Sequence, residues 1–316
     1  QAIAMGLRGG GVQVRGFMTQ SGSTQGLGLA AILRRHALLA GLVLCYALFA
    51  AWMNHRFAIP SHSGKILDLF LRFLVQVPMM VTLALTWRLL DLTYVRKDPD
   101  RIGTLKAEIR AFLTDRRRIA GGLLASVIMT FCLIAFAQMK NLIPRLQPFA
   151  WDQYFMELDR TLHFGEHPYV LVHAIFGSSV GITLFTGLYN LWLFLTYFVL
   201  FGTCFMRSDS LLRMRFLVAF VLTWALGGNL LATLFSSAGP VYFPHLGLGD
   251  AYAELLAILQ HHAAVGPITV IDAHQVLWSM YSRPESLNVI SAFPSMHVAS
   301  SVLMAIFLRR RSSILG

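Results

Sequence analysis

The sequence predicts an all-α protein, a polytopic membrane bundle with about six spanning helices. Apolar residues make up 56% of the 316-residue chain and charged residues only 13%, and the mean hydropathy is +0.61. This is too apolar for an ordinary soluble domain. The formal net charge is +11, but the basic residues gather in short segments between apolar runs. Membrane topology explains that arrangement, so we do not expect a nucleic-acid partner.

Residues 1–33 are rich in glycine and serine and lack apolar periodicity, so we expect a flexible tail. The next element is the first of the spans, which need roughly 20 mainly apolar residues each. A sixth, shorter run begins near residue 296 and ends at three arginines, so we expect it to be tilted or to continue. The five complete runs lie at 37–53, 67–90, 119–137, 185–206 and 215–235.

Two further segments are expected to lie at the membrane surface. Residues 101–118 place Ile102, Leu105, Ile109 and Phe112 on one stripe, which predicts an amphipathic helix on the inner leaflet. The stretch 166–184 is apolar but is broken by Gly177 and Gly181, which favours an interfacial or re-entrant helix over a span.

The basic segments predict the orientation, because lysine and arginine are retained on the cytoplasmic side. Alternating spans place the N-terminal tail, the basic loops and the last arginines on that one face. We expect a bacterial-type plasma membrane with a cytoplasmic N-terminus. Most histidines and other polar residues then lie on the opposite face, in segments 54–66, 138–184 and 236–295. Any active site should therefore be extracytoplasmic.

The segment "AFPSMHVAS", residues 292–300, places a histidine where the last span starts on that face. Pro294 interrupts the chain and Ser295 is a good N-cap. A helix start presents free backbone N–H groups and partial positive charge, which suit an anion such as phosphate. His297 would lie beside that anion and could protonate a leaving oxygen. An ordinary interfacial role, with the backbone satisfying the ring, remains open.

Three stretches resemble a known family. "FPSMH" followed by an apolar run is similar to the second signature, Pro-Ser-x-His, of the type-2 phosphatidic acid phosphatase superfamily. "LDRTLHFGEHPY" (158–169), "SSAGPVYF" (236–243) and "SAFPSMH" (291–297) resemble its branch containing inositol phosphorylceramide synthase. The resemblance implies that residues 138–316 form a phosphatase-type membrane domain holding the last three spans. Residues 34–137 would form three N-terminal spans with a basic cytoplasmic loop.

The resemblance also implies a mechanism through a phosphohistidine. Ser295 would help hold the phosphate and His297 would be the catalytic acid. A third-motif histidine, followed by aspartate four residues later, would attack phosphorus. No histidine of this chain has aspartate at that spacing. We therefore expect the native protein to continue beyond Gly316, carrying that motif. A degenerate, non-enzymatic relative or a transporter-like scaffold is the alternative.

The first motif, usually Lys-x6-Arg-Pro, is matched only in part, since Lys140 is followed at that spacing by Gln147 and Pro148. Lys140, at the outer end of the third span, and Arg283 are candidate phosphate partners, although each also suits contact with lipid headgroups. Tyr242 would border the acceptor or the lipid. Segment 250–288 is long enough for one or two short external helices covering the pocket.

The expected substrate is a membrane lipid phosphate, with either water or a polar alcohol as the acceptor, and phosphatase and transferase activity remain open. No cofactor is expected. The segment "HFGEH", His163–His167, has the spacing of a zinc-binding helix, but Gly165 and Pro168 disfavour a helix there. We therefore expect no metal site.

Overall fold

The chain forms an all-helical membrane-type bundle, described here from a computed structural model. Helices and loops make up the described residues, and no strand occurs among them. The all-α prediction is confirmed for that part of the chain. The residues described are 28–59, 64, 68, 71, 77–207, 210–265, 270–283 and 290–315.

In the described part of the chain, four helices are long and apolar enough to cross a membrane. They are α1 (Leu29–Arg56), α5 (Arg116–Leu146), α8 (Ser179–Cys204) and a continuous helix made of α9 (Leu211–Leu222), the π-helical stretch η2 (Thr223–Leu231) and α10 (Ala232–Leu234). They occur where four of the five complete spans were predicted. α13 (Met296–Leu315) matches the sixth run and carries Arg309–Arg311 near its end.

The remaining predicted span, 67–90, lies partly outside the described residues. Its described part is α3 (Val77–Leu90), followed by the π-helical turn η1 (Asp91–Val95) and by α4 (Arg101–Thr114). The predicted helix 101–118 ends early, because Asp115 leaves the helical conformation and its carboxylate accepts the Arg118 N–H at 2.9 Å. Asp115 therefore caps the start of α5.

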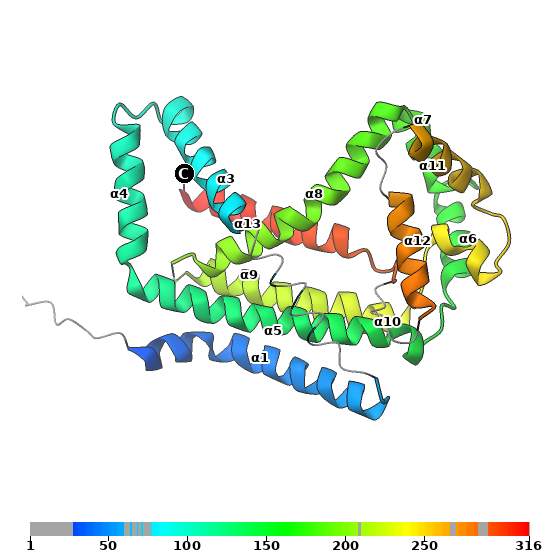
Figure 1. The fold of residues 1–316 in the computed structure, drawn as a ribbon, viewed down its shortest axis with the longest axis horizontal. Helices are drawn as coiled ribbons and strands as arrows, with labels where there is room; N and C mark the ends of the chain where they lie inside the picture. The colour runs from blue at the N-terminus through cyan, green and yellow to red at the C-terminus, as the bar shows by residue number, and fades with distance from the viewer. Residues whose placement is uncertain are drawn as a thin grey trace, which may run out of the picture.

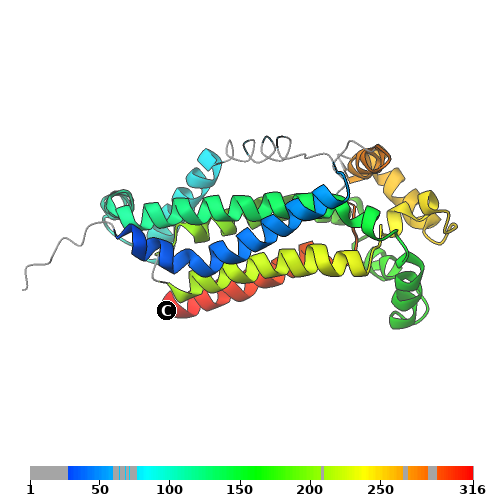
Figure 2. The same cartoon turned by 90° about the horizontal axis from the view of Figure 1, so that it is seen from below.

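The bundle is built by α1, α5, α9 and α13, which run side by side (Figures 1 and 2). Its core is apolar and is shared among these helices and α8. Phe216 of α9 and Phe307 of α13 meet at a ring distance of 4.4 Å. Large apolar side chains also cover the outward faces, as expected for helices surrounded by lipid. The buried core includes Leu39, Met129, Leu200, Leu217 and Phe307.

Short helices lie at one end of the bundle, and the start of α8 leaves the bundle to reach α7 and α11 (Figure 1). The chain breaks at Gly177, as predicted, but Gly181 lies inside α8, where its N–H is capped by Ser178 Oγ at 3.1 Å. Segment 250–288 contains two helices, where one or two were predicted. The short helices are α6 (Asp152–Leu162), α7 (Pro168–Phe176), α11 (Ala253–Val265) and α12 (Val270–Tyr281).

At the opposite end, a fully buried arginine joins three helices. Arg213 of α9 donates to the carbonyl oxygens of Cys204, at 3.1 Å, and Gly121, at 2.9 Å. It also donates to Nε2 of His36 at 3.0 Å. Nδ1 of that ring donates to the Ile32 carbonyl at 2.8 Å, so the imidazole is neutral with its proton on Nδ1. Arg213 therefore fastens α9 to α1, α5 and the end of α8 by hydrogen bonds.

Substituting Arg213 with alanine should destabilise the bundle by on the order of 3 kcal/mol, because charged hydrogen bonds are lost and a cavity forms. The measurement is the unfolding temperature of purified protein in detergent. Arg215, exposed on the same helix, is the matched control, and its alanine variant should melt like the parent. Equal melting of both variants would contradict the role given to Arg213.

Candidate active site

His297 is the second residue of α13 and lies in its first turn. Pro294 precedes the helix, and the exposed Ser295 caps it, since its Oγ accepts the Val298 N–H at 3.4 Å. The expected N-cap is therefore present. This start leaves the first N–H groups of α13 available to an external acceptor.

The imidazole of His297 packs against two aromatic rings of α8. Its ring centre lies 4.3 Å from that of Tyr189, nearly parallel at 20°, and 3.8 Å from that of Trp192 at 32°. Within the described residues, neither ring nitrogen has a hydrogen-bond partner. The ring is therefore held by its faces, while its nitrogens are available to a ligand.

Trp192 is itself fixed by α13. Its Nε1–H donates to the buried Ser300 Oγ at 2.9 Å, and Ser300 donates to the Met296 carbonyl at 2.5 Å. This aromatic wall was not predicted from the sequence. Its only signal was the spacing of Tyr189 and Trp192, three residues apart and thus on one face of a helix.

The loop before α13 is organised by a second residue that the sequence analysis missed, Asp152 at the start of α6. Its buried carboxylate accepts three hydrogen bonds. Oδ1 accepts the Ser237 hydroxyl at 2.8 Å and the Gly239 N–H at 2.7 Å, and Oδ2 accepts the Ala238 N–H at 3.0 Å. The "SSAGPVYF" stretch is thus folded around one carboxylate.

This stretch in turn holds the segment that leads into α13. The Ala292 N–H donates to the Ser237 carbonyl at 2.8 Å. Gly239 has a φ of +98°, and a Cβ at this position would lie 2.9 Å from the Ala292 Cβ. Glycine is therefore required here by backbone conformation and by close approach. Asp152, residues 237–239 and residue 292 together form a connection to the start of α13, which we call the loop clamp.

The predicted phosphate partners lie apart from these contacts. α5 continues to Leu146, so Lys140 lies inside that helix rather than at its end, and its side chain is buried. No carboxylate of the described residues forms an ion pair with it. Arg283 is exposed just after α12. No hydrogen bond joins either residue to His297 in the described part of the chain.

Tyr242 is buried beside Trp278, with nearly parallel rings 5.2 Å apart. Its hydroxyl donates to the His274 carbonyl at 3.2 Å. Burial, with a smaller effect of the Tyr189 hydroxyl, raises the pKa of Tyr242 to about 12. Tyr242 therefore belongs to the aromatic cluster beside α12.

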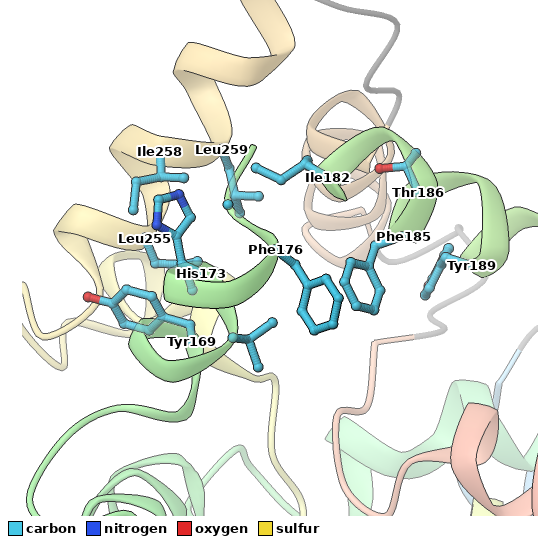
Figure 3. Close-up of a pocket in the computed structure, with 12 residues that line it drawn as sticks. Tyr169, His173, Phe176, Ile182, Phe185, Thr186, Tyr189, Leu255, Ile258 and Leu259 are labelled. Atoms are coloured by element: carbon cyan, nitrogen blue, oxygen red, sulfur yellow. The ribbon is translucent and has the colours of Figure 1, made fainter. Parts of the chain in front are cut away.

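An apolar cavity of about 280 Å³ opens beside Tyr189, between α7, α8 and α11 (Figure 3). Phe176 and Phe185 meet edge to face at 5.2 Å within its wall. Tyr189 lines the cavity and also packs on His297, so one aromatic ring lies between the cavity and the histidine. The other lining side chains include Ile182, Leu255, Ile258 and Leu259.

The "HFGEH" segment is not helical. Phe164 and Gly165 have positive φ angles of 60° and 92°, and His163 Nδ1 contacts the Asp159 carbonyl oxygen at 2.7 Å. His167 packs on Tyr252 at a ring distance of 4.6 Å. Among the described residues, no group of three or more potential ligating side chains gathers as a metal site would require.

The Asp152→Asn variant should loosen the loop clamp, because the amide offers only one oxygen and turns an N–H toward backbone donors. We expect faster hydrogen exchange at Ala238 and Gly239, by on the order of tenfold, measured by mass spectrometry in detergent. Glu157→Gln, an exposed change on the same helix, should exchange like the parent. Unchanged protection in Asp152→Asn would refute the clamp.

Comparison with known proteins identifies the family. Residues 153–315, more than half of the chain, match the family model described as the PAP2 superfamily. None of the curated proteins and none of the solved structures compared with the chain matches it. The matched region contains α6–α13 and the "FPSMH" segment, with the histidine and its aromatic wall. The chain therefore belongs to the PAP2 superfamily, the type-2 phosphatase superfamily that its Pro-Ser-x-His motif resembles.

Proposed function

We propose that the protein transfers or hydrolyses the phosphoryl group of a membrane lipid, with His297 as the general acid. One observation carries this proposal. His297 lies at a helix start with its ring packed on Tyr189 and Trp192 and its nitrogens unpaired within the described residues. Such a ring can meet a phosphate ester oxygen without breaking an existing hydrogen bond.

The start of α13 supplies the phosphate-binding groups. Its free N–H groups and partial positive charge suit an anion, and the exposed hydroxyl of Ser295 can donate to a phosphate oxygen. Lys140 is buried and lacks a carboxylate partner in the described part of the chain, so a bound anion would offset its charge. Arg283 is the second candidate, with a fork of donors that matches phosphate.

In this scheme the protonated His297 gives its proton to the leaving oxygen as the bond from phosphorus to that oxygen breaks. The family resemblance assigns the attack on phosphorus to another histidine, which makes a phosphohistidine and divides the reaction into two steps. We assign no residue of this chain to that attack. Water or an alcohol then takes the phosphoryl group, giving a phosphatase or a transferase.

The apolar cavity beside Tyr189 supports a lipid as the substrate. Its lining is almost purely hydrocarbon and aromatic, and one of its residues packs on His297. A lipid chain in this cavity would leave the phosphate at the start of α13. Tyr242 would border the headgroup or the acceptor.

We place this reaction at the extracytoplasmic face. Arg118 of α5, Arg207 just after α8 and Arg309 of α13 lie toward the opposite end of the bundle, as expected for a cytoplasmic boundary. The α8 and α13 helices start at the end that carries His297. We also propose that the chain belongs to the inositol phosphorylceramide synthase-like branch, because three of its stretches resemble that branch.

Replacing His297 with alanine should lower turnover of a lipid phosphate by on the order of a hundredfold to ten-thousandfold, because the leaving oxygen loses its proton donor. Phosphate release is measured with protein expressed from the complete gene, in detergent micelles containing phosphatidic acid. His55→Ala, an exposed histidine change, should leave turnover unchanged. Normal turnover in correctly folded His297→Ala would refute the assignment of the acid.

A cysteine at Asp250 should react with an impermeant thiol reagent on intact cells, because this exposed residue belongs to the segment that we place outside. The exposed Cys45 is first replaced by serine, whereas Cys132 and Cys204 are buried and can remain. A cysteine at the exposed Lys106 of α4 should react only after permeabilisation. The reverse pattern would overturn the orientation.

A further inference from the structure

The helix α6 exposes an apolar stripe along one side. Tyr154, Leu158 and Leu162 recur every four residues, so they lie on one face of the helix. Their exposed fractions are 53%, 38% and 64%. Phe164, two residues beyond the end of the helix, is 98% exposed. Large apolar side chains therefore face outward along α6 and at the turn that follows it.

The rest of α6 is divided between two other faces. Gln153, Glu157 and Arg160 form an exposed polar face, with a hydrogen bond of 3.2 Å from the Gln153 amide to the Glu157 carboxylate. The third face points into the protein and holds the buried Asp152 and the half-buried Phe155. The exposed surface of α6 thus has an apolar side and a polar side. This division is typical of a helix at the boundary between lipid and water.

The turn after α6 presents Phe164 at a conformational cost. Its φ of +60° is left-handed, which is unusual for a bulky side chain. The turn is held by Gly165, whose N–H donates to the Arg160 carbonyl at 2.7 Å and whose carbonyl accepts the Arg160 Nε–H at 3.0 Å. Backbone strain of this kind gathers at functional sites. The exposed ring of Phe164 is therefore a candidate contact.

The direction of α6 identifies what covers the apolar stripe. Figure 1 shows α6 at the end of the bundle that carries His297, crosswise to the long helices. A helix crosswise to spanning helices runs along the membrane surface. Tyrosine, present in the stripe as Tyr154, is enriched at that surface because its ring is apolar and its hydroxyl is polar. A lipid–water boundary explains both the direction of α6 and its divided surface, whereas a protein partner would explain the stripe alone.

We propose that α6 is an interfacial helix whose apolar stripe, together with Phe164, inserts into the membrane leaflet on the side of His297. The polar face then meets water. Interfacial helices of this kind bury their apolar face roughly 5–10 Å into the boundary between headgroups and acyl chains. The partner of this surface is therefore the bilayer itself.

The inward face of α6 connects this surface to the candidate active site. The ring of Phe155 lies 4.4 Å from that of Phe293, which directly precedes Pro294. Asp152, on the same face, anchors the loop clamp. Both contacts hold the segments that lead into α13. This role rests on the proposed function: α6, lying in the membrane surface, keeps His297 at the level of the lipid phosphates, and its residues are positioning residues.

The first test measures depth without turnover. Cys45 is replaced by serine, and a single cysteine at Leu158 or at Glu157 carries a nitroxide label. The full chain is reconstituted in vesicles of phosphatidylcholine and phosphatidylglycerol. The Leu158 label should lie roughly 5–10 Å below the lipid phosphates, accessible to oxygen and shielded from a water-soluble nickel complex. The Glu157 label, on the polar face of the same helix, should be accessible to the nickel complex.

Two outcomes would overturn the interfacial helix. Equal access of the nickel complex to both labels would show that α6 lies in water. Shielding of the Leu158 label from both oxygen and nickel would show a protein contact in place of lipid. A label at Phe164→Cys tests the turn separately, and a position in water would contradict its insertion.

The positioning role is tested by turnover in the same vesicles. The polar double variant Leu158→Gln, Phe164→Asn should fold, because both positions are exposed and asparagine tolerates a left-handed backbone. Its kcat for phosphatidic acid should fall by roughly tenfold to a hundredfold with KM unchanged, because a displaced His297 no longer meets the leaving oxygen. The apolar double variant Leu158→Met, Phe164→Trp should retain the parental kcat, as should Glu157→Gln.

The proposals fail separately. A Leu158 label in water with His297-dependent turnover would overturn the interfacial helix alone. An inserted label with normal turnover in His297→Ala would overturn the proposed function alone. An inserted label in the parent with an unchanged kcat in the polar double variant would overturn the positioning role.

Discussion

The carboxylate of Asp152 is the contact on which the arrangement around His297 depends. It accepts hydrogen bonds from residues 237, 238 and 239, which come from a different part of the chain. The Ser237 carbonyl then accepts the Ala292 N–H, close to the beginning of α13. Short hydrogen bonds to a buried carboxylate compensate for the hydration that it loses on burial. The start of α13 is therefore fixed by a polar connection at one end of a largely apolar bundle.

The surroundings of His297 both fix the ring in place and leave its nitrogens free, two requirements that usually conflict. A titratable side chain that must exchange protons needs free nitrogens, while precise placement normally uses those nitrogens for hydrogen bonds. Here the ring faces supply the placement through Tyr189 and Trp192, and Trp192 is anchored in turn on Ser300. Aromatic stacking thus positions the group without consuming its donor or acceptor.

Hydropathy was sufficient to predict the helical class and the position of most long helices, because a run such as 119–137 has the length and composition of α5. The start of α13 was predictable from Pro294, Ser295 and the Pro-Ser-x-His motif. The role of Asp152 was not predictable, since a single acidic residue after a tryptophan does not show which distant N–H groups will donate hydrogen bonds to it. Tyr189 and Trp192 were missed for a related reason. Aromatic residues facing lipid and those facing a partner helix have the same helical spacing.

Arg213 has a consequence for how this protein is made. All the acceptors that the structure gives it, on His36, Gly121 and Cys204, precede it in the chain. The ribosome therefore synthesises α1, α5 and the end of α8 before it adds the charged side chain of Arg213. When α9 enters the bilayer, a guanidinium that would be costly in lipid alone finds its partners already synthesised. The order of the helices along the sequence thus favours insertion from the N-terminus, with the charge on α9 selecting correct assembly.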